Sequence, residues 1–310
     1  MHESIYLLSL GNFHLTAYGL CLMGGAALAV ALTVLLARKT MGVDNALTLC
    51  TVVAPCALIG ARILYVLPMI EYVLLDYGGA GFIFRPWEGG YTLYGAVLGG
   101  LLGAWLYSRK KDPVRTLDLL APGAALAVCI ARAAEYFTTQ GLGDYLEDEA
   151  LWRFPFAVES CYGTWQVPVF FYEALCAAII LVVCLAALRR SKPGRTAEIF
   201  LALLSCSQIM LESLREDEFI RFGFVRFTMI MAAVTLAALM WLTLRRCRKT
   251  VGWSRWQIIR TVMFFAGVVI VILIEFALDK STINNVLLYV IMAATLGMMG
   301  TAILREGVKG

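Results

Sequence analysis

We single out seven ionisable side chains within the long apolar stretches of this sequence: Arg62, Arg132, Glu135, Glu173, Glu212, Arg215 and Glu275. An ionisable group inside a membrane span costs about 2.5–3.5 kcal/mol on insertion scales, so each such residue needs a physical reason. The planar guanidinium group of arginine binds phosphate through two parallel hydrogen bonds. Three arginines brought to one depth would therefore form a site for an anionic group, such as the phosphate of a phospholipid.

A purely structural interpretation of these charges is also open. Arg132 and Glu135 are three residues apart, as are Glu212 and Arg215, so each pair could form an ion pair on one face of its own helix. An arginine near the end of a span can also extend its head group to the membrane interface.

The elements that must position these groups are strongly apolar. Hydrophobic residues make up 61% of the 310 residues and charged residues 15%, against about 45–50% and about 25% in soluble domains. The mean hydropathy is +0.79. This composition excludes soluble, disordered and disulfide-rich secreted proteins. It predicts an all-α, polytopic integral membrane protein.

Apolar runs of about 20 residues, the length that crosses a bilayer as a helix, define the predicted spans. They cover residues 13–37, 46–70, 90–108, 118–137, 167–188, 197–216, 222–244, 257–279 and 283–304. The runs lack the alternation of a membrane β-strand, so a barrel is not expected. The first run is too long for a cleaved signal peptide, and its flank carries Glu3 in place of a basic residue.

Lysine and arginine cluster after every second predicted span and in the C-terminal tail. By the positive-inside rule, this pattern predicts an N-terminus outside the membrane and a cytoplasmic C-terminus. Counting along each span then places the seven buried charges in the outer half of the bilayer. Tyr18 and Tyr94 fall at the same depth.

Two outer loops, 71–89 and 138–166, are longer than a turn requires, and long loops are often functional. Their aromatic residues would also suit an interfacial belt. The nine cysteines form no CxxC pair, and the two histidines, His2 and His14, lie near the start. We therefore expect no metal site. A nucleic-acid partner is not expected either.

The segment 83–96 reads IFRPWEGGYTLYGA and resembles the IFxxWEGGxxxHGG segment of bacterial prolipoprotein diacylglyceryl transferases. Further similarities follow that family's order at Tyr18-Gly19 and at 60–66, 118–137, 167–173 and 211–216. Together they extend over residues 10–249 and are specific as a set. The resemblance implies a seven-span core at 1–249, so 250–310 would be a two-helix membrane extension.

The resemblance also implies an activity at the outer face of the bacterial cytoplasmic membrane. That family moves a diacylglyceryl group from phosphatidylglycerol to the thiol of a lipobox cysteine on a secreted preprotein, and glycerol phosphate leaves. The expected partners are phosphatidylglycerol, or another anionic phospholipid, and lipobox preproteins. No metal or cofactor is required.

Site residues are expected at positions that match the family's segments. Arg132 and Arg215 would stabilise charge on the phosphate leaving group, and Tyr94 and Glu135 would activate the acceptor. The residues expected to bind the lipid are Tyr18, Arg62, Glu88, Gly89, Gly95, Gly143, Tyr172 and Glu173. Glu173 and Tyr172 could instead order the helices or the arginines, and Gly95 begins a GxxxG pattern that also packs helices closely.

The chain departs from the family pattern where that pattern has histidine or asparagine. Tyr94 and Val167 replace two histidines, and Glu135 replaces an asparagine. A free tyrosine, with a pKa near ~10, is a poor base at neutral pH, whereas a thiol must lose its proton to attack. Glu135 is therefore the expected base.

These departures leave two alternatives open. One is a related transferase that uses the same lipid donor with a non-protein acceptor. The other is a non-catalytic lipid-binding protein or a transporter. Transport is the less favoured, because the predicted buried charges do not continue into the inner half of the bilayer.

Overall fold

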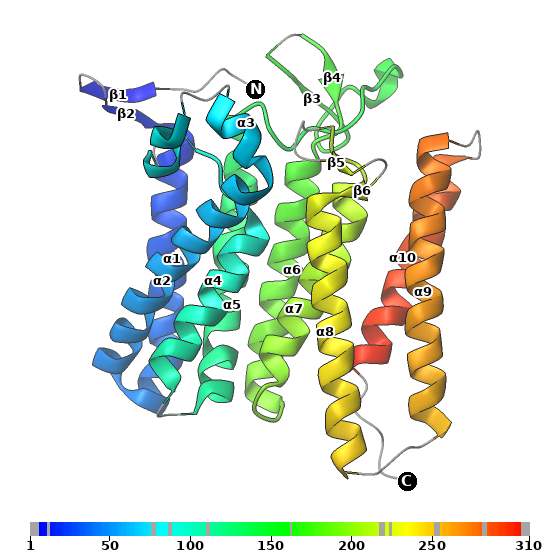
Figure 1. Cartoon of the computed structure of the whole chain (residues 1–310). Coiled ribbons are helices and arrows are strands. Elements are labelled where there is room, and N and C mark those ends of the chain that lie inside the picture. The colour runs from blue at the N-terminus through cyan, green and yellow to red at the C-terminus, as the bar shows by residue number, and fades with distance from the viewer. Residues whose placement is uncertain are drawn as a thin grey trace. The chain divides into compact units, whose positions relative to one another are not determined.

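A computed structural model of the chain describes residues 6–10, 13–75, 79–85, 89–109, 112–161, 163–216, 221–222, 225–250, 255–280 and 284–304. Within these residues the chain is mostly helical (Figure 1). The helices are α1 (Ala17–Met41), α2 (Val43–Val66), α3 (Ile70–Leu75), α4 (Leu93–Ser108), α5 (Pro113–Ala134), α6 (Val169–Arg190), α7 (Arg195–Glu212), α8 (Phe227–Thr250), α9 (Arg255–Lys280) and α10 (Asn285–Leu304).

Seven of the described helical segments are long and apolar enough to cross a membrane. They are α1, α2 extended to Leu75, α5 extended to Phe137, α6, the first 22 residues of α8, α9 and α10. This confirms the predicted all-α, polytopic membrane fold.

The other two predicted spans are helical but differ from these seven. The run 90–108 gives α4, which has 16 residues because Thr92 caps it, accepting a hydrogen bond from the amide of Gly95. At 1.5 Å per residue, α4 is about 24 Å long, short of the ~30 Å hydrocarbon core. The run 197–216 gives α7, whose 18 residues include Arg195, Glu198 and Glu212.

The predicted first span begins too early. Residues Phe13–Thr16 form strand β2, which pairs antiparallel with β1 (Tyr6–Leu10). The helix begins at Ala17, where the Thr16 hydroxyl accepts a hydrogen bond from the amide of Gly19 at 3.0 Å. A side-chain acceptor of this kind satisfies an amide that the first turn of a helix leaves unpaired.

The long loop 138–166 is folded rather than extended. It contains a 3-10 turn (Glu149–Leu151) and the antiparallel strands β3 (Val158–Glu159) and β4 (Trp165–Gln166). Trp152 and Trp165 stack with their ring centroids 5.7 Å apart. A further pair of short antiparallel strands, β5 (Arg221–Phe222) and β6 (Val225–Arg226), lies between α7 and α8 in the chain.

The chain forms two compact units. The first unit contains Met1–Ala26, Ala125–Cys184 and Glu198–Gly310, and the second contains Ala27–Ala124 and Leu185–Ala197. In the second unit α2 and α4 pack with their backbones in close contact, because Gly60 faces Gly95 and Gly99. In the first unit α9 packs along α10, where Gly267 lies against Met299.

Buried charges occur at both ends of the helices, which corrects the expectation of a single depth. Asp118 and Glu198 are buried near the starts of α5 and α7. Asp118 accepts hydrogen bonds from the amides of Gly194 and Ala197, and Glu198 forms an ion pair with Arg246. These carboxylates therefore hold helix starts and connections in place.

Candidate functional site

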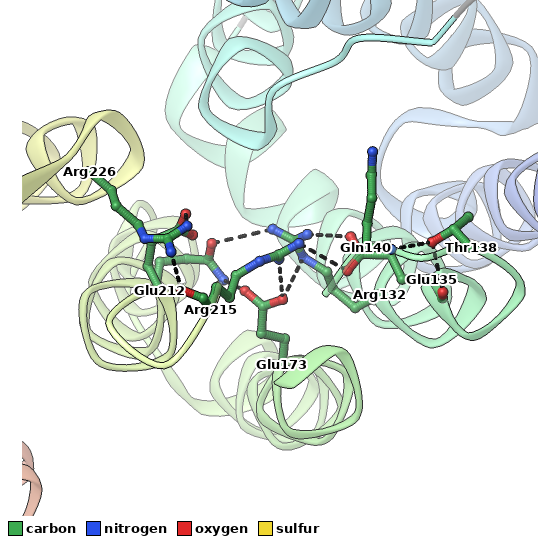
Figure 2. A network of polar contacts seen from close by, with 9 residues as sticks. Arg132, Glu135, Thr138, Gln140, Glu173, Glu212, Arg215 and Arg226 are labelled. Atoms are coloured by element: carbon green, nitrogen blue, oxygen red, sulfur yellow. Dashed lines mark hydrogen bonds and ion pairs between the residues drawn. The ribbon is translucent and has the colours of Figure 1, made fainter. Parts of the chain in front are cut away.

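Four of the predicted charges converge in the first unit. Arg132 lies in the last turn of α5, and Glu135 follows in a 3-10 turn, Glu135–Phe137. Glu173 lies in the second turn of α6, and Arg215 lies just beyond the end of α7. We call these four residues the arginine–glutamate cluster; Figure 2 shows their side chains pointing toward one another.

Each carboxylate of the cluster contacts both arginines. Arg132 donates to Oε1 of Glu135, and Arg215 donates to Oε2 at 3.3 Å. Oε2 of Glu173 lies 2.7 Å from Nη1 of Arg215 and 3.4 Å from Nε of Arg132. The two guanidinium groups are therefore held together by the carboxylates they share.

The cluster is shielded from solvent. The exposed fraction of the side chain is 14% for Arg132, 7% for Glu135 and Arg215, and 1% for Glu173. Two positive and two negative charges balance formally, and buried charges are tolerated only when such pairing is present. Arg132 is the most exposed member, so it is the one best placed to meet a ligand.

Gln208 of α7 is a member of this network that the sequence interpretation missed. Its Nε2 donates to Oε1 of Glu173 at 2.9 Å, and its Oε1 accepts from Arg132 at 3.4 Å. The side chain is 2% exposed. A glutamine within a predicted span, four residues before Glu212, was the available signal.

Arg226 of β6 is the second residue that was missed. It is 4% exposed, donates to the backbone carbonyl of Arg215 and lies 3.8 Å from a carboxylate oxygen of Glu212. Its position inside the predicted span 222–244 should have placed it among the buried charges. Arg226 thus fixes the main chain at the residue that carries one cluster guanidinium.

Gly143 completes the backbone support of Arg215. The two residues form an isolated antiparallel bridge, and the amide of Glu216 donates to the carbonyl of Leu142 at 3.0 Å. A Cβ atom at Gly143 would meet the carbonyl oxygen of Leu214. Only glycine therefore allows the loop to approach this segment so closely.

The two predicted tyrosines of the first unit differ in their surroundings. Tyr18 of α1 lies near enough to Glu135, Arg132 and Arg215 for their charges to act on its hydroxyl. Tyr172 of α6 is half-buried and donates to the carbonyl of Pro155 in the loop, at 3.0 Å. Tyr18 thus belongs to the surroundings of the cluster, whereas Tyr172 contacts the loop.

Arg62 lies in the second unit and is 7% exposed. Its guanidinium donates to the carbonyls of Phe82, Arg85, Gly89 and Gly90, and its Cζ lies 4.3 Å from the centre of the Phe82 ring. These described contacts hold the loop that leads into α4.

Tyr91 lies in the same loop, with Arg62 5.8 Å from the centre of its ring. Burial raises the pKa of the Tyr91 phenol, and the positive charge of Arg62 opposes that shift.

Three further predicted residues, Tyr94, Gly95 and Gly89, also lie in the second unit. Tyr94 is 1% exposed, and Gly95 packs against the backbone of Gly60 and Ala61. Gly89 has a φ of 80°, which favours glycine, and its carbonyl accepts from Arg62. Glu88 lies outside the described residues.

An apolar cavity of about 560 Å³ lies in the first unit. Its lining residues are Ala133, Tyr136, Phe154, Ala157, Val158, Glu159, Trp165, Phe170 and Phe171. Ala133 and Tyr136 directly follow Arg132 and Glu135 in the chain, so the same segment contributes to the cluster and to the cavity lining. Among the described residues, no three His, Cys, Asp or Glu side chains are grouped so as to hold a metal ion.

Comparison with known proteins supports the resemblance. A family model described as prolipoprotein diacylglyceryl transferase matches residues 5–245. Several similar curated proteins carry the name phosphatidylglycerol–prolipoprotein diacylglyceryl transferase. The protein from Streptococcus uberis is 27% identical over 253 residues, which cover 78% of this chain and 95% of that protein.

Two further relatives of the same name have similar sequence identities to this chain. The Streptococcus pneumoniae serotype 4 protein is 29% identical over 231 residues, covering 70% of this chain and 84% of its own length. The Streptococcus agalactiae serotype Ia protein is 30% identical over 217 residues, covering 67% and 82%. This multi-pass membrane protein therefore belongs to the prolipoprotein diacylglyceryl transferase family.

Proposed function

We propose that this chain transfers the diacylglyceryl group of phosphatidylglycerol to the cysteine thiol of a lipobox preprotein. The reaction takes place at the outer face of the bacterial cytoplasmic membrane, with the N-terminus outside as the basic loops predict. Family membership and the printed names of the relatives support the reaction class. The convergence of Arg132 and Arg215 on shared carboxylates is the structural observation that carries the proposal.

The bond changes define where charge must be stabilised. The cysteine sulfur attacks the glycerol carbon that bears the phosphate, so a carbon–sulfur bond forms and the carbon–oxygen bond to phosphate breaks. Glycerol phosphate leaves with the electron pair of that bond. The thiol proton passes to a base, and the phosphodiester monoanion becomes a monoester with a second negative charge.

Arg132 and Arg215 stabilise that second charge. A preorganised cation in a shielded site interacts with developing charge more strongly than the same cation would in water. The described contacts of Arg132 use three of the five N–H groups of a guanidinium, so donors remain for a phosphate oxygen. Glu173 and Gln208 keep both guanidinium groups in position while the phosphate departs.

Glu135 takes the thiol proton in this proposal. The two histidines of this chain, His2 and His14, precede α1, and Glu135 is one of the two carboxylates that contact both arginines. A proton acceptor positioned next to the phosphate site can serve the attacking thiol and the leaving group in one arrangement. The aromatic cavity of the first unit would hold apolar residues of the acceptor peptide.

The test is transfer by the purified full-length chain from labelled phosphatidylglycerol to a lipobox peptide. Arg132→Ala and Arg215→Ala should each lower the rate by about 100-fold or more, the usual effect of removing one preorganised donor. Arg190→Ala, at an exposed arginine that ends α6, is the matched control and should leave the rate unchanged. Wild-type rates in both cluster variants would refute the proposed roles.

A different acceptor is the second candidate, and it rests on the replacements at Tyr94, Glu135 and Val167. Incubating labelled phospholipid with membranes that contain the chain separates the two candidates by product mobility. A labelled lipoprotein as the sole product supports the first, and a labelled small alcohol, sugar or lipid supports the second. Complementation of cells that lack their own lipoprotein transferase gives an independent answer.

A further inference from the structure

The segment 138–143 connects two members of the arginine–glutamate cluster through its main chain. At its start, the amide and the hydroxyl of Thr138 both donate to the carbonyl of Glu135, at 2.9 and 2.8 Å. At its end, Gly143 forms the backbone bridge with Arg215. Figure 2 shows Thr138 beside Glu135. The segment therefore passes along the cluster from Glu135 to Arg215.

Gly141, within this segment, lies against the carboxylate of Glu135. It is buried, and its φ of 75° is in the left-handed region that favours glycine. A Cβ atom at this position would collide with Oε2 of Glu135 and would lie 2.7 Å from Cβ of Phe170. One added methyl group would therefore touch both the cluster and a residue that lines the aromatic cavity.

The carboxylate of Glu135, rather than Phe170, would have to move away from such a methyl group. Phe170 lies in the first turn of α6 and its amide donates to the carbonyl of Gly141 at 2.8 Å, so the backbone fixes its Cβ atom. The carboxylate is the end of a flexible side chain. Its Oε2 lies 3.3 Å from Nη2 of Arg215, so displacement of this oxygen would lengthen or break the contact between Glu135 and Arg215.

We propose that Gly141 is a positioning residue for Glu135, and that it acts through its lack of a side chain. The absence of a Cβ atom allows Oε2 to occupy the place from which it contacts Arg215. The inference rests on the proposed function for its catalytic consequence, because Glu135 takes the thiol proton in that proposal. Gly141 thus contributes to the placement of the base, whereas Gly143 supports the main chain of Arg215.

Displacement of the Glu135 carboxylate should affect the chemical step more than lipid binding. A misplacement of about 1 Å at a catalytic group can cost a factor of about one hundred in rate. Arg132 keeps its contacts with Gln208 and Glu173, which do not involve Glu135. Its guanidinium group remains available to the phosphate, so KM for phosphatidylglycerol should change little.

The experiment compares Gly141→Ala with Gly163→Ala in the full-length chain. The φ values of the two glycines are 75° and 73°, so alanine meets similar backbone strain at both positions. A Cβ atom at Gly163 would meet nothing within 4 Å among the described residues, so that variant is the matched control. We expect Gly141→Ala to lower kcat about tenfold or more, with KM for phosphatidylglycerol within about threefold of wild type. Gly163→Ala should leave both constants unchanged. Equal kcat values in the two variants would overturn the inference.

A double-mutant cycle gives a readout that does not depend on activity. Glu135→Ala removes the oxygen that the methyl group of Gly141→Ala would meet, so the two substitutions should not be additive in the unfolding midpoint. Gly141→Ala should lower the midpoint less in the Glu135→Ala chain than in the wild-type chain, whereas Gly163→Ala should lower it equally in both. Additive midpoint shifts for Gly141→Ala would refute the positioning contact. Non-additive shifts in a chain with no transferase activity would retain that contact and reject the proposed function.

Discussion

Arg132 and Arg215 donate to opposite oxygens of a single carboxylate, that of Glu135. The spacing of the two guanidinium groups is therefore set by a side chain that lies between them. The family pattern to which this segment is similar has asparagine at that position. In this chain the bridging residue carries a negative charge, which both joins the arginines and competes with a phosphate for them.

Glu135→Gln removes the negative charge of this side chain and keeps its shape. Removal of the charge should tighten the binding of phosphatidylglycerol to the full-length chain several-fold, because the arginines lose a competing anion. The same substitution should lower kcat by about 100-fold, since a general base typically contributes 10²–10⁴ to a rate. Lipid binding in nanodiscs and single-turnover transfer measure the two effects. An unchanged kcat would exclude Glu135 as the base.

Glu173→Gln should lower the stability of the protein as well as its activity. The Glu173 side chain is 1% exposed and contacts both arginines, so the amide leaves buried positive charge uncompensated. Breaking a buried pair in this way costs about 3–5 kcal/mol. Unfolding in a detergent series would measure the loss. Glu147→Gln, at an exposed loop position, should stay within about 0.5 kcal/mol of wild type.

Much of the fold follows from composition, because a run of about 20 apolar residues has few alternatives to a membrane helix. The pairing of Arg132 with Glu135 also follows from their spacing of three residues, since α5 continues directly into the 3-10 turn that carries Glu135. The second carboxylate shared by the arginines could not be predicted in this way. Glu173 comes from α6, and contacts between helices leave no local pattern in a single sequence.

The expected ion pair between Glu212 and Arg215 does not form, because α7 ends between the two residues. Side chains three residues apart are neighbours only if one helix continues through both, but α7 ends at Glu212. Beyond that point the chain turns, so Arg215 contacts Glu173 and Glu135 while Glu212 forms an ion pair with Arg226. Helix ends are the least predictable feature of a sequence, and here one of them decides the partners of a site residue.

Asp118→Ala should destabilise the second unit without affecting the arginine–glutamate cluster. The buried carboxylate accepts hydrogen bonds from the amide of Gly194, just before α7, and from the amide of Ala197 in its first turn. Loss of a capping acceptor costs about 1 kcal/mol, and leaving buried amides unpaired raises the cost to about 1–3 kcal/mol. Asp112→Ala removes a similar cap at the exposed start of α5 and should cost less. Equal losses of stability in the two variants would contradict the importance of burial.

Neighbouring glycines of α4 offer the sharpest test of how α2 and α4 pack. A Cβ atom at Gly99 would fall on the backbone carbonyl of Cys56, which can move only if the two helices separate. A Cβ atom at Gly100 would meet only the side chains of Ala57 and Val53, both at 3.9 Å. Gly99→Ala should therefore lower the free energy of unfolding by about 1–3 kcal/mol, the usual cost of overpacking. Gly100→Ala should be neutral or stabilising by up to about 1 kcal/mol, because alanine favours the helix. Thermal unfolding of the two variants in one detergent gives the comparison, and equal midpoints would contradict the close backbone contact.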